Sequence, residues 1–210
     1  MTKKAIIWDW NGTLLNDTDI CVECMNRMLD KRGIALLDKK RYRDIFTFPV
    51  KEYYLKAGID LEKEAFEIPA MEFIKLYHEQ LHAANLFPSV VKVLKYFKKK
   101  GCYQAILSAM EHESLETSLK EKGVYPYFDV ITGINDHYAH SKLEIGRELI
   151  DSIDYHKSDM LLVGDSLHDF EVAKELGIDC ILVANGHQSY ERLKEKTPYV
   201  LKELSEVMEY

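Results

Sequence analysis

Short apolar runs alternate with amphipathic segments over much of the chain, and the first of these runs is Ala5–Trp8. It carries no charge, as is typical of a strand buried on both faces. Four later runs predict further strands, over 103–107, 129–132, 160–163 and 180–183. Because helical segments separate these strands, the pattern predicts an α/β fold with a mostly parallel sheet.

The stretch between about 16 and 85 departs from this alternation. The apolar residues from Ile20 to Leu29 fall on one helical face, and the spacing predicts further helices around 38–45, 49–57 and 69–83. No convincing strand occurs there. We therefore predict a small all-helical domain at 16–85, inserted after the first strand of an α/β core formed by 1–15 and 86–210.

The second part of the chain predicts the helices of the core. They begin near Ser89, around Leu115, at Ser141 and at about 169, and a short helix closes the chain. The first of them ends in three lysines at 98–100. These lysines could bind a polyanion, but cations in the last turn of a helix also complement the helix dipole. Because the chain is acidic overall, the second interpretation is favoured.

Composition and charge limit the classes of function. The chain has 210 residues, 47% of them hydrophobic and 30% charged, with a net charge of −7, so we expect no nucleic-acid partner. No apolar run approaches the roughly 20 residues of a membrane span, and Ala5–Trp8 is too short for a signal-peptide core. We expect a cytoplasmic protein without a membrane partner, with four reduced cysteines. The sequence does not indicate an oligomeric state.

Candidate catalytic residues follow the predicted strands. Asp9 comes directly after the first strand, Ser108 after the second, and Asp165 and Asp169 after the fourth, while Lys142 opens a helix. Open α/β sheets bind ligands at the carboxyl ends of their strands. A nucleophile, a cation, hydrogen-bond donors and hard oxygen ligands for a metal suit a phosphoryl group.

This set resembles the haloacid dehalogenase-like (HAD) phosphohydrolases. Asp9-Trp10-Asn11-Gly12-Thr13 matches their first motif, Asp-x-Asp-Gly-Thr, except that Asn11 replaces the second aspartate. Ser108 matches the second motif, Lys142 the third, and Gly164-Asp165-x-x-x-Asp169 the fourth. The resemblance covers essentially the whole chain, and it implies a Rossmann-like core with a small helical (C1-type) cap over the active site.

The resemblance also implies a reaction. Asp9 would attack the phosphorus of a small phosphorylated metabolite and form an aspartyl-phosphate, which water then hydrolyses. Asp9, Asp165, the backbone carbonyl of Asn11 and Asp169 would form the magnesium site. Phosphoglycolate and sugar-phosphate phosphatases share this cap type, but the cap does not identify the substrate. Four residues of the helical segment are candidates to contact it, although each is equally interpretable as a solvated or packing residue: Arg43, Lys51, Tyr53 and Tyr54.

Asn11 weakens the expected chemistry. In the family, the second aspartate protonates the leaving group, a contribution of roughly 10²–10⁴-fold that an amide cannot supply. We therefore expect a slow phosphatase, one restricted to good leaving groups, or one that uses another acid, for which His168 and His112 are candidates. The alternative is a catalytically weakened protein that binds phosphate and regulates.

Three other patterns suggest different chemistry, and each is disfavoured. His78-Glu79-Gln80-Leu81-His82 has zinc-protease spacing but no obvious third ligand. Gly164-Asp165-Ser166-Leu167 spells a GDSL-esterase signature, which that family carries near the N-terminus. The Cys21–Cys24 pair has metal or redox spacing but lies in a predicted helix, so packed thiols are the better interpretation.

Overall fold

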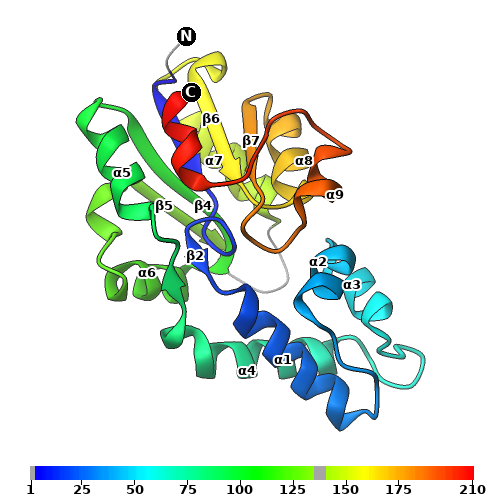
Figure 1. The fold of residues 1–210 in the computed structure, drawn as a ribbon. Helices are drawn as coiled ribbons and strands as arrows, with labels where there is room; N and C mark the ends of the chain where they lie inside the picture. The colour runs from blue at the N-terminus through cyan, green and yellow to red at the C-terminus, as the bar shows by residue number, and fades with distance from the viewer. Residues whose placement is uncertain (1–2, 135–140) are drawn as a thin grey trace.

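A six-stranded sheet forms the centre of the computed structural model, which describes residues 3–134 and 141–210 (Figure 1). Every pair of neighbouring strands is parallel, in the order β5-β4-β1-β6-β7-β8, which confirms the predicted α/β fold. The strands are β1 (Ala5–Trp8), β4 (Tyr103–Glu111), β5 (Val130–Ile134), β6 (Met160–Gly164), β7 (Asp179–Val183) and β8 (Val200–Leu201).

The central position of β1 explains its uniform hydrophobicity. Trp8 pairs with Ile106 of β4 on one side and with Val163 of β6 on the other. Ile6 and Trp8 belong to one hydrophobic cluster, whereas the alternate residues of β1 belong to a second cluster on the opposite face. Both faces of β1 are therefore buried, as predicted.

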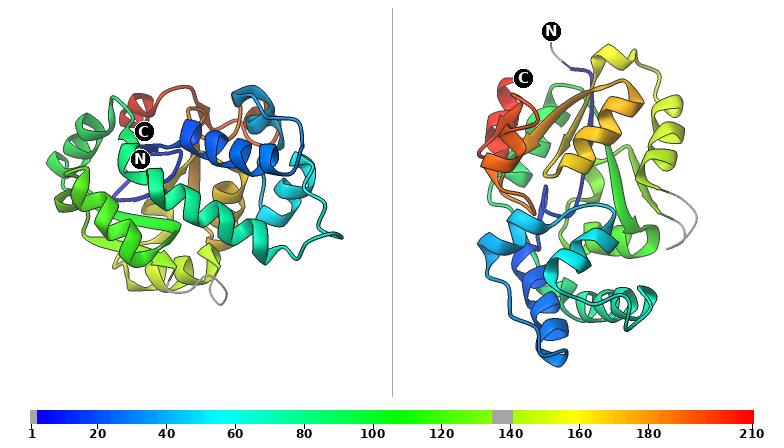
Figure 2. Two further views of the ribbon diagram at one scale, coloured as in Figure 1. Left: turned by 90° about the horizontal axis from the view of Figure 1, so that it is seen from below. Right: turned by 90° about the vertical axis from the view of Figure 1, so that its right-hand side faces the viewer.

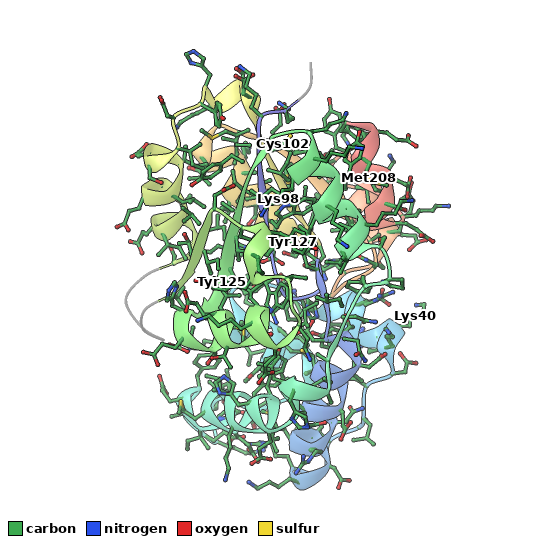
Figure 3. The ribbon with its side chains drawn as sticks, turned by 90° about the vertical axis from the view of Figure 1, so that its left-hand side faces the viewer. Lys40, Lys98, Cys102, Tyr125, Tyr127 and Met208 are labelled. Atoms are coloured by element: carbon green, nitrogen blue, oxygen red, sulfur yellow. The ribbon has the colours of Figure 1, made fainter. Side chains whose placement is uncertain are left out.

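Helices cover both faces of the sheet. One face packs against α5 (Val90–Lys99), α6 (His112–Glu121) and the 3₁₀ helix η4 (Leu204–Glu209), the other against α7 (Lys142–Ser152) and α8 (Leu167–Leu176). Figure 3 shows the α5 side, where the Tyr96 hydroxyl donates to the carbonyl oxygen of Met208 at 2.8 Å. Three short helices complete the core: η2 (Tyr125–Tyr127), η3 (Lys157–Asp159) and α9 (Tyr190–Lys194).

The remaining helices lie together beyond the carboxyl ends of the strands (Figures 1 and 2). They are α1 (Thr18–Lys31), α2 (Lys39–Ile45), α3 (Val50–Ala57), α4 (Glu67–Gln80) and the 3₁₀ helix η1 (Leu81–Ala83), and we call them the inserted helices. The chain enters and leaves them through a two-stranded antiparallel ribbon, β2 (Leu15–Asn16) and β3 (Asn85–Leu86). The sequence did not predict this ribbon, because two residues are too short to show a period.

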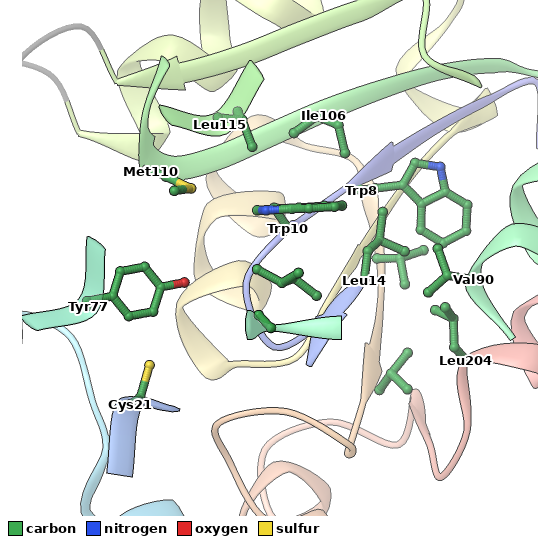
Figure 4. Close-up of a cluster of buried hydrophobic side chains, with 14 of the residues drawn as sticks. Trp8, Trp10, Leu14, Cys21, Tyr77, Val90, Ile106, Met110, Leu115 and Leu204 are labelled. Atoms are coloured by element: carbon green, nitrogen blue, oxygen red, sulfur yellow. The ribbon is translucent and has the colours of Figure 1, made fainter. Parts of the chain in front are cut away.

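A continuous hydrophobic cluster joins the inserted helices to the sheet. Figure 4 shows it running from Trp8 on β1 through Trp10 and Leu14 to Cys21 on α1 and Tyr77 on α4. Each of these side chains is less than 10% exposed. This shared packing fixes where the inserted helices sit above the edge of the sheet.

Candidate functional site

A buried lysine joins two of the candidate carboxylates. Asp9 lies at the end of β1, and its backbone N–H donates to Val163. Lys142, in the first turn of α7, places Nζ 2.5 Å from Oδ1 of Asp9 and 2.6 Å from Oδ1 of Asp169. The hydroxyl of Thr13 donates to the other oxygen of Asp9 at 3.0 Å. The structure thus brings together residues that the sequence separates by more than 150 positions.

Asp9, Asp165 and Asp169 form a compact acidic cluster. Their carboxylate oxygens lie within 4.8 Å of one another, and all three side chains are buried. Burial raises the pKa of Asp9 to about 6, with Lys142 opposing and Asp169 reinforcing the rise. Burial likewise raises the pKa of Asp165 to about 7. Such a cluster of hard oxygens has the donor chemistry to hold a divalent cation.

The hydrogen bonds of Asp169 give it a different place in the cluster from Asp165. Its Oδ2 accepts from the backbone N–H of Ser166 at 3.0 Å and from the Ser166 hydroxyl at 2.7 Å, in a capping box that begins α8. The other carboxylate oxygen of Asp169, Oδ1, accepts a hydrogen bond from Nζ of Lys142. Asp169 therefore orients Lys142 and the loop after β6. Since this box also engages the hydroxyl of Ser166, the geometry does not support an esterase nucleophile there.

Asn11 is fixed by two acceptors that the sequence did not identify. Its Nδ2 donates to Oδ2 of Asp17 at 2.9 Å and to the hydroxyl of Tyr77 at 2.7 Å. The Tyr77 hydroxyl in turn donates to Asp17 at 2.7 Å, and the N–H of Gly12 donates to the other Asp17 oxygen at 2.9 Å. Asp17 precedes the first residue of α1, but its side chain makes no capping bond to that helix. Its carboxylate instead accepts the hydrogen bonds from Asn11, Gly12 and Tyr77.

His187 is the second residue that sequence reasoning missed. Its Nε2 lies 3.4 Å from Oδ1 of Asp17, its Nδ1 lies 2.9 Å from the hydroxyl of Tyr42, and its backbone N–H donates to Asp165 at 2.5 Å. Burial opposes protonation, but the carboxylate of Asp17 outweighs it and raises the pKa of His187 to about 9. The available signal was its position in the loop after a predicted strand, at the sheet edge that carries Asp9.

The close approach of these groups requires glycine at position 12. Gly12 has φ +74°, and a Cβ there would lie 2.3 Å from Oδ2 of Asp165 and 2.5 Å from the ring of His187. Any side chain would therefore displace a carboxylate of the acidic cluster. The positive φ and these close contacts explain why position 12 is a glycine.

A cavity of about 400 Å³ separates the acidic cluster from the inserted helices. Asp9, Ser108, Lys142 and Asp165 line the end at the sheet, and Ser108 is itself almost fully buried. The inserted helices supply most of the remaining wall, largely as aromatic rings. Six of these rings are Tyr42, Phe46, Phe48, Tyr53, Phe73 and Tyr77.

Two of the four predicted substrate-contacting residues line this cavity. Tyr53 and Tyr54 do, whereas Arg43 and Lys51 do not. The guanidinium of Arg43 donates to the carbonyl oxygen of Asn185 at 2.7 Å, and Lys51 is exposed. The cationic candidates are thus turned away from the cavity, because one holds a core loop and the other faces solvent.

The two histidines proposed as substitute acids differ in position. His168 lines the cavity and stacks on Phe48, with ring centroids 4.5 Å apart, and burial lowers its pKa. His112 is not among the lining residues and places Nε2 3.9 Å from Glu116 on its own helix. Only His168 is placed to meet a molecule in the cavity.

The remaining sequence patterns have structural explanations. His78 lies on α4 and His82 on η1, and neither belongs to a cluster of potential metal ligands among the described residues. Cys21 and Cys24 are buried, free thiols, as expected. In the lysine run, Lys98 donates to the carbonyl oxygen of Pro126 at 2.5 Å and lies 5.7 Å from the ring centre of Tyr127, as labelled in Figure 3.

Within the described part of the chain, no helix is both long and apolar enough to cross a membrane.

Comparison with known proteins places this geometry in a family. Residues 6–183 match the family model for haloacid dehalogenase-like hydrolases. The chain is 26% identical over 205 residues to the probable phosphatase IndB of Dickeya dadantii, covering 95% of this chain and 89% of that protein. It is 23% identical to the phosphoglycolate phosphatase of Synechococcus elongatus, covering 93% and 90%.

Solved structures show the same fold. The haloacid dehalogenase-like hydrolase SP0104 of Streptococcus pneumoniae superposes with a TM-score of 0.83 at 19% identity, covering 99% of this chain and 98% of that one. A predicted phosphatase from Clostridium acetobutylicum gives the same TM-score and identity, covering 100% and 98%. The match to the family model spans most of the chain, including all four sequence motifs, and the chain belongs to the haloacid dehalogenase-like hydrolases.

Proposed function

We propose that this protein is a magnesium-dependent phosphatase that hydrolyses a small phosphomonoester through an aspartyl-phosphate at Asp9. The observation that carries the proposal is the buried contact of Lys142 with both Asp9 and Asp169 at the floor of a cavity. The names of the two relatives, a probable phosphatase and a phosphoglycolate phosphatase, support phosphoryl transfer.

The acidic cluster fits a magnesium ion. Three buried carboxylates face one lysine, and burial, reinforced by the neighbouring carboxylates, raises the pKa values of Asp9 and Asp165. Asp9, Asp165 and the backbone carbonyl of Asn11 would hold the ion, with Asp169 beside it through the loop that it orients. When bound, the ion would offset the negative charge of the carboxylates and the phosphoryl oxygens.

The residues of the chain have separate roles in this proposal. A carboxylate oxygen of Asp9 forms a bond to phosphorus while the bond from phosphorus to the leaving oxygen breaks, and that oxygen takes the electron pair. Lys142 and Ser108 stabilise the transferring phosphoryl group. Water then attacks the phosphorus, releases phosphate and restores Asp9. In this scheme the inserted helices act as a cap, 16–85, over the core of 1–15 and 86–210, and they exclude water from the cavity.

A second candidate function rests on Asn11. Because Asp17 and Tyr77 fix its amide as a donor, position 11 offers no carboxylic acid to the leaving group. A protein with the same contacts among Asp9, Lys142 and Asp169 that does not hydrolyse phosphate esters would bind phosphate and act as a regulator.

One experiment separates the two functions. We expect the wild type with magnesium to release phosphate from acetyl phosphate, and to bind beryllofluoride, an aspartyl-phosphate mimic, as followed by ¹⁹F NMR. Asp9→Asn should lose both properties and remain folded, while Asp151→Asn, at an exposed position on α7, serves as the matched control. Beryllofluoride binding without turnover would favour the regulator, and full turnover by Asp9→Asn would exclude the proposed nucleophile.

A further inference from the structure

We propose that the substrate is an aryl phosphomonoester, whose uncharged aromatic leaving group occupies the part of the cavity lined by the inserted helices. This inference rests on the proposed function, because it names the substrate class of the same site. Four features of the cavity carry it: its ring-lined wall, its charges, an unpartnered hydroxyl, and Asn11.

The wall opposite the acidic cluster is built from aromatic rings in mutual contact. Phe46 lies 5.3 Å from Tyr53 and 5.5 Å from Phe48 between ring centroids, all in the segment that contains α2 and α3. On α4, Phe73 and Tyr77 stack nearly parallel, with an interplanar angle of 10° and centroids 6.0 Å apart. Rings offer an aromatic guest both stacked and edge-to-face contacts, which stabilise it beyond the burial of its area. The cavity, at about 400 Å³, is also in the size range of small-molecule sites.

The charges around the cavity disfavour an anionic leaving group. Among the described residues that line it, Lys142 is the only lysine or arginine, and Asp9 and Asp169 already engage its Nζ. The ring of His187 also lines the cavity, and Asp17 already pairs with it. Glu111, whose carboxylate caps the start of α6, also lines the cavity. The described part of the cavity wall therefore offers no unpaired cation to a second carboxylate or phosphate on the substrate, and burying such a group without one is costly. Glycolate is a leaving group of this unfavourable kind.

One hydroxyl in the wall indicates that a ligand completes it. Tyr53 lines the cavity and is only 2% exposed, yet its OH has no hydrogen-bond partner within the described part of the structure. A buried hydroxyl without a partner is destabilising, because it has lost its hydrogen bonds to water without replacing them. A neutral polar atom on an aromatic ligand would remove that cost, whereas further apolar packing would not.

The amide at Asn11 independently favours aryl phosphomonoesters as substrates. Without a carboxylic acid at this position, the leaving oxygen departs with its electron pair and without a proton. A phenol has a pKa of about 10, as for tyrosine, whereas an alcohol is nearly as weak an acid as water, with a pKa of about 16. An aryloxide can therefore leave unprotonated far more readily than an alkoxide. The missing acid and the ring-lined wall favour the same substrates.

Three substrates test the inference at saturating magnesium: phenyl phosphate, 4-carboxyphenyl phosphate and acetyl phosphate. The carboxylate does not make the phenol a poorer leaving group, so the first two compare recognition by the cavity. We expect kcat/KM for phenyl phosphate to exceed that for 4-carboxyphenyl phosphate at least tenfold. Equal values, or a preference for the carboxylated compound, would overturn the inference. If acetyl phosphate is still hydrolysed in that case, the proposed function survives; if none of the three is hydrolysed, both fail.

A charge placed in the wall gives a gain-of-function test. Ile74 of α4 lines the cavity, and Ile74→Lys should raise the ratio of kcat/KM for 4-carboxyphenyl over phenyl phosphate at least tenfold. Met71→Lys on the same helix is the matched control, because Met71 is 50% exposed and outside the cavity wall. An unchanged ratio in Ile74→Lys, with acetyl phosphate still turned over, would show that the leaving group does not occupy this wall.

Discussion

The amide of Asn11 is held as a hydrogen-bond donor between the carboxylate of Asp17 and the hydroxyl of Tyr77. The surroundings of this residue are therefore suited to an amide as they stand. An aspartate at position 11 would place a second carboxyl group beside Asp17. Two carboxyl groups at hydrogen-bonding distance do not both ionise readily, so one of them would keep its proton.

Asn11→Asp should consequently supply the missing general acid. We expect kcat for propyl phosphate to rise by up to the roughly 10²–10⁴-fold that general acid catalysis contributes, with a much smaller change for phenyl phosphate. The measurement is steady-state turnover of both substrates with magnesium.

The control for this experiment is chemical. Asn11-Gly12 is a deamidation-prone dipeptide, so peptide mass analysis must show an intact amide in the wild-type preparation. If propyl phosphate turnover stays the same in Asn11→Asp, another group transfers the proton. His168 would then be the first residue to replace, because it lines the cavity beside Phe48.

At the scale of elements, the loop after β7 joins the core to the inserted helices. It brings His187 between Asp17, at the start of α1, and Tyr42 of α2. Since the pKa of His187 is raised from 6.5 to about 9 in the folded chain, this ion pair stabilises the fold fully below about pH 6.5. The stabilisation is then lost as the pH rises through about 9.

His187→Gln should remove this alkaline loss of stability. Between pH 7 and 9.5, in the presence of a chelator, we expect the wild type to lose about 2–3 kcal/mol of unfolding free energy from this residue. The variant should be less stable at pH 7 but show a shallower decline. Denaturant unfolding measures the slope, with exposed His156→Gln as the control. Parallel declines in the wild type and His187→Gln would show that the ion pair does not stabilise the fold.

At the scale of the whole molecule, the sheet brings the three carboxylates of the acidic cluster together at the carboxyl ends of its strands, although they are distant in sequence. A bound magnesium ion should therefore stabilise the complete fold, by about 2.7 kcal/mol at a concentration one hundred times its Kd. For a chain of this length we expect a rise in Tm of about 5–10 °C. Asp165→Asn should abolish that rise, and Asp151→Asn should retain it. An equal rise in Asp165→Asn, measured by differential scanning calorimetry, would remove Asp165 from the proposed metal site.

The sequence predicts the parts of this molecule that follow a local pattern. Ala5–Trp8 is uniformly apolar because β1 is buried on both faces, and Asp9 marks the strand end at which ligands bind. The contact between Asp17 and His187 has no such pattern, because it joins residues 170 positions apart through tertiary packing alone.

Three local features were missed by the sequence analysis or predicted only in part, for related reasons. The helix α5 begins directly after Ser89, as predicted, but the side chain of Ser89 makes no capping bond to it. The strand β8 has only two residues, which is too short for a pattern of apolar and polar positions to reveal it. The direction of Arg43, toward Asn185, depends on a core loop that is distant in sequence.

The order of the strands also governs how the chain is made. β1 is synthesised well before its two partners, β4 and β6, and the later of these ends at Gly164. At about 5–20 residues per second, the apolar strand waits roughly 10–30 s on the ribosome before both neighbours exist. During that interval its unpaired edges can recruit other chains. Substitutions that weaken the pairing of β1 should therefore reduce the yield of soluble protein, while the molecules that do fold keep their full specific activity.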